Sequence, residues 1–146
     1  MGSSKWLNLY RYNTEQNNTL RTINSLKKQG YRIIATTPHT NDVNLENFAV
    51  EKGKFALMFG SEKPGLSKIA MENADEFLKI PMYGFTESFN ISVSAAIILH
   101  HLSLKLRNSG IAIYLSDREK DDIILKWLKQ SIKKSDIIIK EFLSGK

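Results

Sequence analysis

Short apolar blocks alternate with polar, glycine-containing segments along the chain. Over Lys5–Tyr12 the side chains alternate, with Leu7 and Leu9 on one side and mostly aromatic residues on the other, which predicts a strand. Uninterrupted apolar blocks predict three further strands, over Tyr31–Thr36, Phe55–Phe59 and Phe77–Ile80. Strands that are apolar throughout are typical of a parallel sheet whose two faces are both covered.

Segments with helical spacing separate these strands. Asn17–Gln29 carries apolar residues at that spacing, and Gly30 suits the position just after a helix. The other predicted helices are Leu66–Asn73, the long apolar Asn90–Arg107, and a basic amphipathic tail from a capping box at Ser116–Glu119 through Leu143.

The order of these elements indicates an α/β fold, with a parallel sheet flanked by helices. Pro38–Asn44 is predicted to form a turn. Four strands are few for such a sheet, which indicates that strands are missing or are supplied by a partner.

The composition excludes several classes of protein. The chain has 146 residues, enough for one ordinary domain, and its lack of cysteine excludes a disulfide scaffold, a cysteine-based zinc site and a thiol nucleophile. No apolar run reaches the roughly 20 residues of a membrane helix and no signal peptide is visible, so a cytoplasmic protein is expected. No metal site is expected, because His39 is isolated and the adjacent His100 and His101 would point apart on a helix.

The net charge of +6 is unevenly distributed. Residues 1–34 hold six basic side chains and one acidic one, residues 35–100 hold five basic and eight acidic ones, and residues 118–146 hold eight basic and five acidic ones. Basic ends favour contact with nucleic acid or another polyanion. Surface lysines that only keep the protein soluble explain the same excess.

Ligands of open parallel sheets bind beyond the carboxyl ends of the strands. Three predicted loops lie there: Thr36–Thr40, Gly60–Gly65 and Pro81–Phe89. The two glycines of the second loop permit a tight turn and close approach of a ligand to the backbone. Glu62 would repel a phosphate, so this loop suits a neutral or partly cationic ligand, although an ordinary Gly/Pro turn explains the same residues.

Ser88 and Asn90 directly precede the long predicted helix. Either residue could be the N-cap of that helix. The exposed N–H groups and polar side chains could instead contact a carboxylate or phosphate, and the two roles are compatible.

Two other surfaces each allow two interpretations. The aromatic side of the first predicted strand, with Trp6, Tyr10 and Tyr12, could stack on bases or be buried against a neighbouring element or subunit. The apolar stripe of the tail, beside Trp127, predicts an amphipathic helix that packs on the domain, with RNA contact as the alternative.

Two segments resemble motifs of the SPOUT superfamily, in its SpoU/TrmH branch of RNA ribose 2′-O-methyltransferases. Phe55–Ser67 resembles the second motif of this branch, a strand followed by Gly-x-Glu-x-x-Gly. Ile80–Ala96 resembles the third, Ile-Pro-Met followed by Ser-Leu-Asn-Val-Ser-x-Ala, with Phe89 in place of the usual leucine. The order and spacing agree, and the resemblance extends from Met1 to about Arg107.

This resemblance implies methyl transfer from S-adenosyl-L-methionine to a ribose 2′-hydroxyl of RNA, with a tRNA guanosine favoured over rRNA. It also implies that the sheet contains a trefoil knot and that the protein is active as a homodimer. The reaction implied by the resemblance requires no metal ion. By position, the implied cofactor-binding residues are Gly60, Ile80, Met82 and Phe89, together with Thr36 or its neighbour Thr37. The implied active-site residues are Glu62, Ser88 and Asn90.

The first motif of the family, an Asn followed by an Arg that is held to activate the ribose hydroxyl, has no counterpart here. Arg11 lies near the start, but its context does not match. We therefore expect an N-terminally incomplete fold, in which residues 1–110 form the C-terminal part of the methyltransferase domain and 111–146 form the tail. A remnant that binds cofactor or RNA, or dimerises, without turnover is the alternative function. A plain nucleotide-binding module is a third class, which Glu62 disfavours.

Overall fold

The structure is a computed structural model that describes residues 6–13, 17–38 and 43–145. The chain forms two compact units. The larger unit is Tyr12–Ala112, and the smaller one combines the described residues up to Arg11 with those from Ile113 onward. Within the described residues, no helix combines the length and the apolar character needed to cross a membrane.

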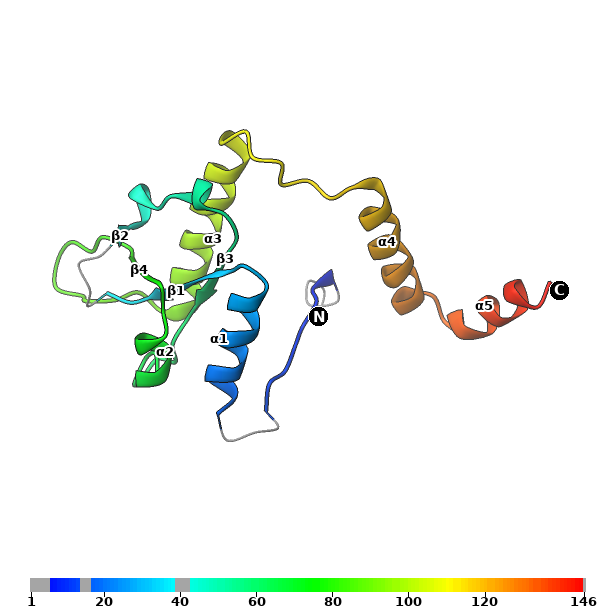
Figure 1. Cartoon of the computed structure of the whole chain (residues 1–146), viewed down its shortest axis with the longest axis horizontal. Helices are drawn as coiled ribbons and strands as arrows, with labels where there is room; N and C mark the ends of the chain where they lie inside the picture. Colours follow the sequence, from blue (N-terminus) through cyan, green and yellow to red (C-terminus); the bar gives the residue numbers. More distant parts are fainter. Residues whose placement is uncertain (1–5, 14–16, 39–42, 146) are drawn as a thin grey trace. The chain divides into compact units, whose positions relative to one another are not determined.

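The larger unit is built on a sheet of four parallel strands (Figure 1). The strands are β1 (Arg32–Thr36), β2 (Val43–Asn44), β3 (Phe55–Met58) and β4 (Glu76–Lys79), in the spatial order β2-β4-β1-β3. The central strand β1 pairs Ile34 with Leu57 on one side and with Glu76 on the other. This arrangement confirms the predicted α/β class and three of the predicted strands, whereas the knot stays a prediction.

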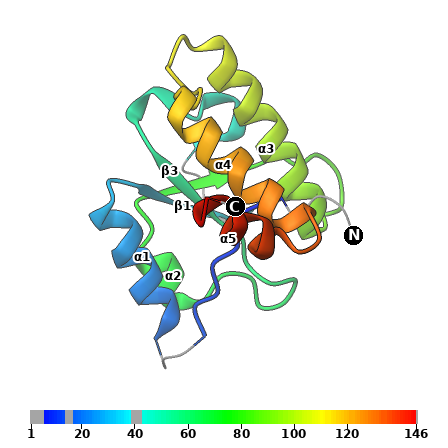
Figure 2. The ribbon, with the colours of Figure 1, turned by 90° about the vertical axis from the view of Figure 1, so that its right-hand side faces the viewer.

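Helices cover both faces of this sheet. On one side, α1 (Asn18–Lys28) lies beside the short α2 (Lys68–Glu72), and the long α3 (Ile91–Asn108) lies on the other side (Figure 2). Ile33 and Ile34 are both fully buried, and adjacent strand residues point to opposite faces. Their burial therefore reflects cover on both faces, as the unbroken apolar strands predicted.

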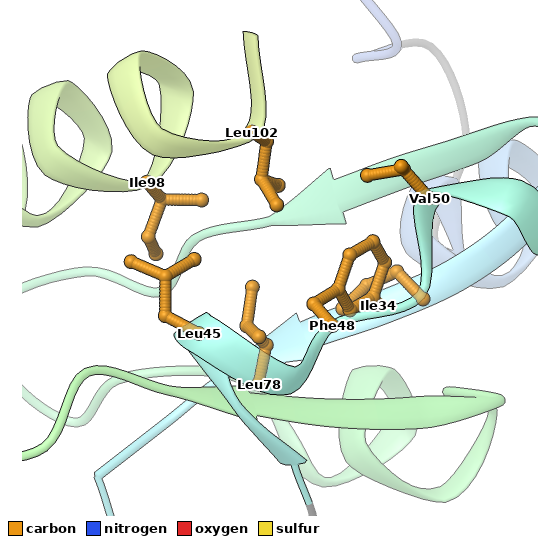
Figure 3. Packing of buried hydrophobic residues seen from close by; sticks show 7 residues of the cluster. All are labelled: Ile34, Leu45, Phe48, Val50, Leu78, Ile98 and Leu102. Atoms are coloured by element: carbon orange, nitrogen blue, oxygen red, sulfur yellow. The ribbon is translucent and has the colours of Figure 1, made fainter. Parts of the chain in front are cut away.

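The main hydrophobic core lies between the sheet and α3. Ile98 and Leu102 of α3 meet buried residues of the strands and of two 3₁₀ turns, η2 (Leu45–Asn47) and η3 (Val50–Lys52) (Figure 3). The cluster is Ile34, Leu45, Phe48, Val50, Leu78, Ile98 and Leu102. It fixes the start of α3 relative to the ends of the strands, which is where the predicted loops lie.

Gly30 ends α1 as expected. Its φ is +82°, and its N–H donates to the carbonyl of Lys27 while the N–H of Tyr31 donates to that of Leu26. These two bonds form a Schellman motif, whose left-handed position favours glycine because no Cβ is present. The chain can therefore reverse directly from α1 into β1.

Asp75 joins three elements at the start of β4. Its carboxylate accepts hydrogen bonds from the N–H of Ile33 at 2.7 Å and from the ammonium of Lys27 at 2.7 Å. Burial raises the pKa of Asp75, but these two hydrogen bonds and the positive charges of Lys27 and Arg32 outweigh it, so the pKa is lowered overall. The ionised carboxylate thus helps to hold α1, β1 and β4 together.

The smaller unit contains two helices, α4 (Asp117–Ser131) and α5 (Ser135–Leu143). The predicted capping box is present, because the Ser116 hydroxyl accepts from the N–H of Glu119 and the Glu119 carboxylate accepts from the N–H of Ser116. Lys134, at φ +60°, separates the two helices, so the helical tail is interrupted rather than continuous.

In the same unit, the rings of Trp6 and Trp127 meet edge to face, with centroids 5.0 Å apart. The ammonium of Lys126 also donates to the side-chain oxygen of Asn8. Within the aromatic stripe at the start of the chain, Trp6 thus packs on Trp127, whereas Tyr10 is 77% exposed, and burial against another subunit stays a prediction.

Two predictions about secondary structure are wrong. Residues 6–12 of the predicted strand Lys5–Tyr12 form no strand, because a strand needs a neighbour for its backbone groups and this segment is not part of the described sheet. The predicted turn Pro38–Asn44 contains β2, which is too short for hydrophobic periodicity to reveal. Residues 1–5 and 39–42, with parts of these segments and His39, lie outside the described residues.

Candidate functional site

A cavity of about 660 Å³ opens where the parallel strands end. Its walls come from the segments that follow β1, β3 and β4 and from the first turns of α3. Neighbouring parallel strands direct their carboxyl ends to the same edge of the sheet, and there the loops part to leave a crevice. The position of this cavity is thus set by the topology of the larger unit.

The loop after β3 is closed by its two glycines. A Cβ at Gly60 would lie 2.3 Å from the carbonyl carbon of Gly65 and 2.4 Å from the nitrogen of Leu66, closer than any side chain can approach. The N–H of Ser61 donates to the carbonyl of Gly65 at 3.1 Å, and Gly65 itself has a φ of +84°. The loop therefore presents bare backbone to the cavity.

Thr36, the last residue of β1, also lines the cavity. Its hydroxyl donates to the carbonyl of Met58 at 2.8 Å, across the β1–β3 pair. The hydroxyl hydrogen is thus used to join the two strand ends, while the hydroxyl oxygen can still accept a hydrogen bond.

Asn90 connects the loop after β3 with α3. Its side-chain oxygen accepts from the N–H of Ser92 at 2.8 Å, which makes Asn90 the N-cap of α3. Its side-chain amide donates to the carboxylate of Glu62 at 3.1 Å. Asn90 is therefore the N-cap of α3, whereas Ser88 lines the cavity without capping the helix, and contact of either residue with a ligand stays a prediction.

All eight predicted site residues line this one cavity: Thr36, Gly60, Glu62, Ile80, Met82, Ser88, Phe89 and Asn90. The sequence interpretation missed contributions from α2 and from the interior of α3, where Met71, Ser94 and Ile98 also reach the wall. Helical spacing predicts that such residues face the hydrophobic core. The sequence alone does not distinguish a residue that is buried in the core from one that lines a cavity beside it.

The formal charges of the lining balance. Glu62 and Glu87 line the cavity together with Lys63 and Lys79, among apolar residues from all three loops. Among the residues that the structure describes, no three potential metal ligands form a cluster. A mixed wall of this kind suits an organic ligand with apolar parts and one or more charges.

A parallel α/β sheet with a ligand cavity at its carboxyl edge, bounded by the two quoted motifs, defines a class of small-molecule-binding domains. The sequence profile of the SpoU rRNA Methylase family matches residues 1–100. The chain therefore belongs to the SpoU rRNA Methylase family.

Known proteins similar to this chain agree with that assignment. It is 42% identical over 138 residues to a tRNA (guanosine(18)-2'-O)-methyltransferase of Borreliella burgdorferi, covering 94% of this chain and 61% of the relative. The crystal structure of the TrmH/SpoU tRNA modifying enzyme of A. aeolicus aligns with a TM-score of 0.65 and 29% identity, covering 78% of this chain and 59% of that one. This chain thus spans less than two thirds of each.

A third likeness concerns the fold alone. The SpoU methyltransferase AviRb of Streptomyces viridochromogenes, solved in complex with the cofactor AdoMet, aligns with a TM-score of 0.53 at 22% identity. The alignment covers 68% of this chain and 37% of that protein.

Proposed function

We propose that this chain carries an RNA methyltransferase site, which transfers a methyl group from S-adenosyl-L-methionine to a ribose 2′-hydroxyl. The observation that carries the proposal is the convergence of all eight predicted site residues on one cavity, in whose wall Glu62 and Asn90 are hydrogen-bonded to each other. The activity named for the relatives supports the same reaction.

The cavity fits S-adenosyl-L-methionine in size and chemistry. Its volume of about 660 Å³ lies within the range typical of small-molecule sites. The cradle at Gly60, where no Cβ fits, offers backbone donors and acceptors, and Ile80, Met82 and Phe89 offer apolar surface for an adenine ring. The carboxylate of Glu62 is compatible with a positive sulfonium, and unfavourable for the phosphates of a nucleotide.

In the proposed reaction the cofactor, when bound, supplies a methyl group that its sulfonium has already activated. The residues of this chain then have to hold the ribose hydroxyl in line and favour loss of its proton. Glu62 orients that hydroxyl by accepting its hydrogen bond, and Asn90 fixes the carboxylate from the N-terminus of α3. Ser88 adds a hydroxyl beside them on the same wall.

The proposed substrate is a guanosine ribose of tRNA, in keeping with the names of the relatives. A basic excess at the two ends of the sequence supports attraction of the RNA backbone. A homodimer and a cytoplasmic location belong to the same proposal.

The test is transfer of labelled methyl from S-adenosyl-L-methionine to unmodified tRNA, with rRNA in parallel. We expect label in tRNA as 2′-O-methylguanosine after nuclease digestion, and none in tRNA made with 2′-deoxyguanosine. Glu62→Gln should lower the rate at least about tenfold, since it removes the charge of the acceptor. The matched control is Glu72→Gln, on the exposed surface of α2 outside the cavity.

The outcomes separate the proposal from its rival. Saturable heat on titration with S-adenosyl-L-methionine, without transfer to either RNA, would support the remnant that binds cofactor without turnover. Tight binding of ATP in place of S-adenosyl-L-methionine would contradict the proposal altogether.

A further inference from the structure

The loop after β4 carries two aromatic rings at the mouth of the cavity. The chain leaves the cavity wall after Met82 and returns to it at Glu87. Between them, Tyr83 is 91% exposed and Phe85 is fully exposed. Gly84, at φ +108°, lies between the two rings, and a Cβ there would meet nothing within 4 Å. This tip of the loop therefore projects into open space.

Neither ring contributes to the packing of the larger unit. In the part of the chain that the structure describes, no ring–ring or cation–π contact involves Tyr83 or Phe85. The residues that follow, Thr86 to Ser88, are exposed and polar. Two isolated rings on a polar loop do not form the continuous apolar patch of a protein–protein interface. They have the form of a stacking platform, in which each ring offers an open face to a base.

We propose that Tyr83 and Phe85 stack on unpaired bases of the RNA whose ribose enters the cavity. This inference rests on the proposed function, because that function brings an RNA ribose to the cavity. Tyr83 directly follows a wall residue, and consecutive Cα atoms are about 3.8 Å apart, so its ring lies within reach of a nucleotide at the mouth. Lys63, from the loop after β3, is exposed on the same cavity and can pair with a phosphate.

Stacking of this kind distinguishes unpaired RNA from paired RNA, rather than one base sequence from another. Every base has a π-face, but a base in a duplex already uses both of its faces. The two rings would therefore favour loops and single strands over paired RNA. The ribose hydroxyl in the cavity remains the group that reacts, and the rings act as positioning residues for its nucleotide.

The experiment measures RNA affinity by fluorescence anisotropy with the full chain and three labelled ten-nucleotide probes. They are oligo(A), oligo(U) and a strand of the same length with abasic riboses. Tyr83→Ala and Phe85→Ala should each weaken binding of oligo(A) about tenfold, with a smaller loss for oligo(U) and little change for the abasic strand. Tyr83→Phe keeps the ring and should bind within about twofold of the unchanged chain.

Tyr114→Ala is the matched control, because Tyr114 is 82% exposed and lies in the other unit. Titration with S-adenosyl-L-methionine keeps the two proposals apart. Unchanged cofactor affinity with weaker oligo(A) binding supports stacking. Equal losses for oligo(A) and the abasic strand, or no loss, overturn it and leave the methyltransferase proposal standing. A change in oligomeric state with RNA affinity unchanged overturns it in favour of a protein contact.

If the unchanged chain fails to bind S-adenosyl-L-methionine, the proposed function fails. The comparison among the three probes still decides whether the rings stack.

Discussion

Gly60→Ala tests how the loop after β3 forms the cavity. Gly60 lies outside the left-handed region, so the substitution adds a methyl group without backbone strain. That methyl would lie 2.3 Å from the carbonyl carbon of Gly65 and 2.4 Å from the nitrogen of Leu66. Both neighbours are backbone atoms and cannot rotate away. The loop must therefore open, and its ends must separate.

The expected cost follows from that geometry. Inserting a methylene-sized group into a closely packed site costs about 1–3 kcal/mol. For a chain of this size each kcal/mol lowers Tm by about 4 °C, so we expect a loss of about 4–12 °C. Because the backbone of Gly60 forms part of the proposed cofactor cradle, the affinity for S-adenosyl-L-methionine should also fall at least about tenfold.

Two other glycines provide matched comparisons. Gly65 (φ +84°) and Gly53 (φ +96°) both adopt backbone conformations that favour glycine, and a Cβ at either meets nothing within 4 Å. Alanine at either position should cost of order 1–3 kcal/mol through strain alone. Gly53 lies outside the cavity, so Gly53→Ala should lower Tm and leave the affinity for S-adenosyl-L-methionine unchanged.

The assays are thermal unfolding and calorimetric titration with S-adenosyl-L-methionine. If Gly60→Ala keeps both the Tm and the cofactor affinity of the unchanged chain, the steric argument is refuted. If Gly53→Ala weakens the cofactor as much as Gly60→Ala does, the loss reports general destabilisation, and the cradle at Gly60 has no special role.

Three further predictions concern other parts of the structure. Asn90→Asp keeps the oxygen that caps α3 but places a second carboxylate beside that of Glu62, so methyl transfer should fall at least about tenfold. Tm should fall less than for Asn90→Ala, which removes the cap, and equal losses of Tm in the two variants would contradict this reasoning. Ser116→Ala removes the capping box of α4 and should lower the stability of that helix by about 1 kcal/mol, measured by amide hydrogen exchange, with no change in affinity for S-adenosyl-L-methionine. The ionised Asp75 contributes stability above its ordinary pKa near 4, and this stability is lost as the pH falls through the lowered pKa of the folded state. In urea unfolding between pH 2 and pH 7, the free energy of unfolding should therefore rise with pH less steeply for Asp75→Asn than for the unchanged chain. Identical slopes for the two proteins would show that Asp75 does not contribute to the pH dependence of stability.

The fold was predictable wherever the residues of a segment indicate its secondary structure without reference to the rest of the chain. β1, β3 and β4 are unbroken apolar blocks, and α3 is a long apolar segment with a capping residue in front of it. β2 has two residues, which is too short for any periodic pattern. The segment Trp6–Tyr12 alternates as a strand does, but alternation describes one chain only and cannot supply the neighbour that a strand requires.

The site was predictable as a set of residues rather than as a geometry. The motifs marked Gly60, Glu62 and Asn90, and the topology of a parallel sheet placed them at one edge. The hydrogen bond between Glu62 and Asn90 joins residues 28 positions apart, and the contact between Gly60 and the backbone of Gly65 depends on how the loop closes. Both contacts depend on the tertiary structure, so the pattern of residues along the sequence does not predict them.

The position of β1 between two strands that follow it in the sequence also determines when the cavity can form during synthesis. β1 is made before either strand that pairs with it, and the cavity wall extends from Thr36 to Ile98 along the chain. At ordinary translation rates of about 5–20 residues per second, roughly 3–12 s pass between the synthesis of the first wall residue and that of the last. β1 lacks one or both of the strands that pair with it until β4 ends at Lys79, so the strand stays incompletely paired for most of that interval.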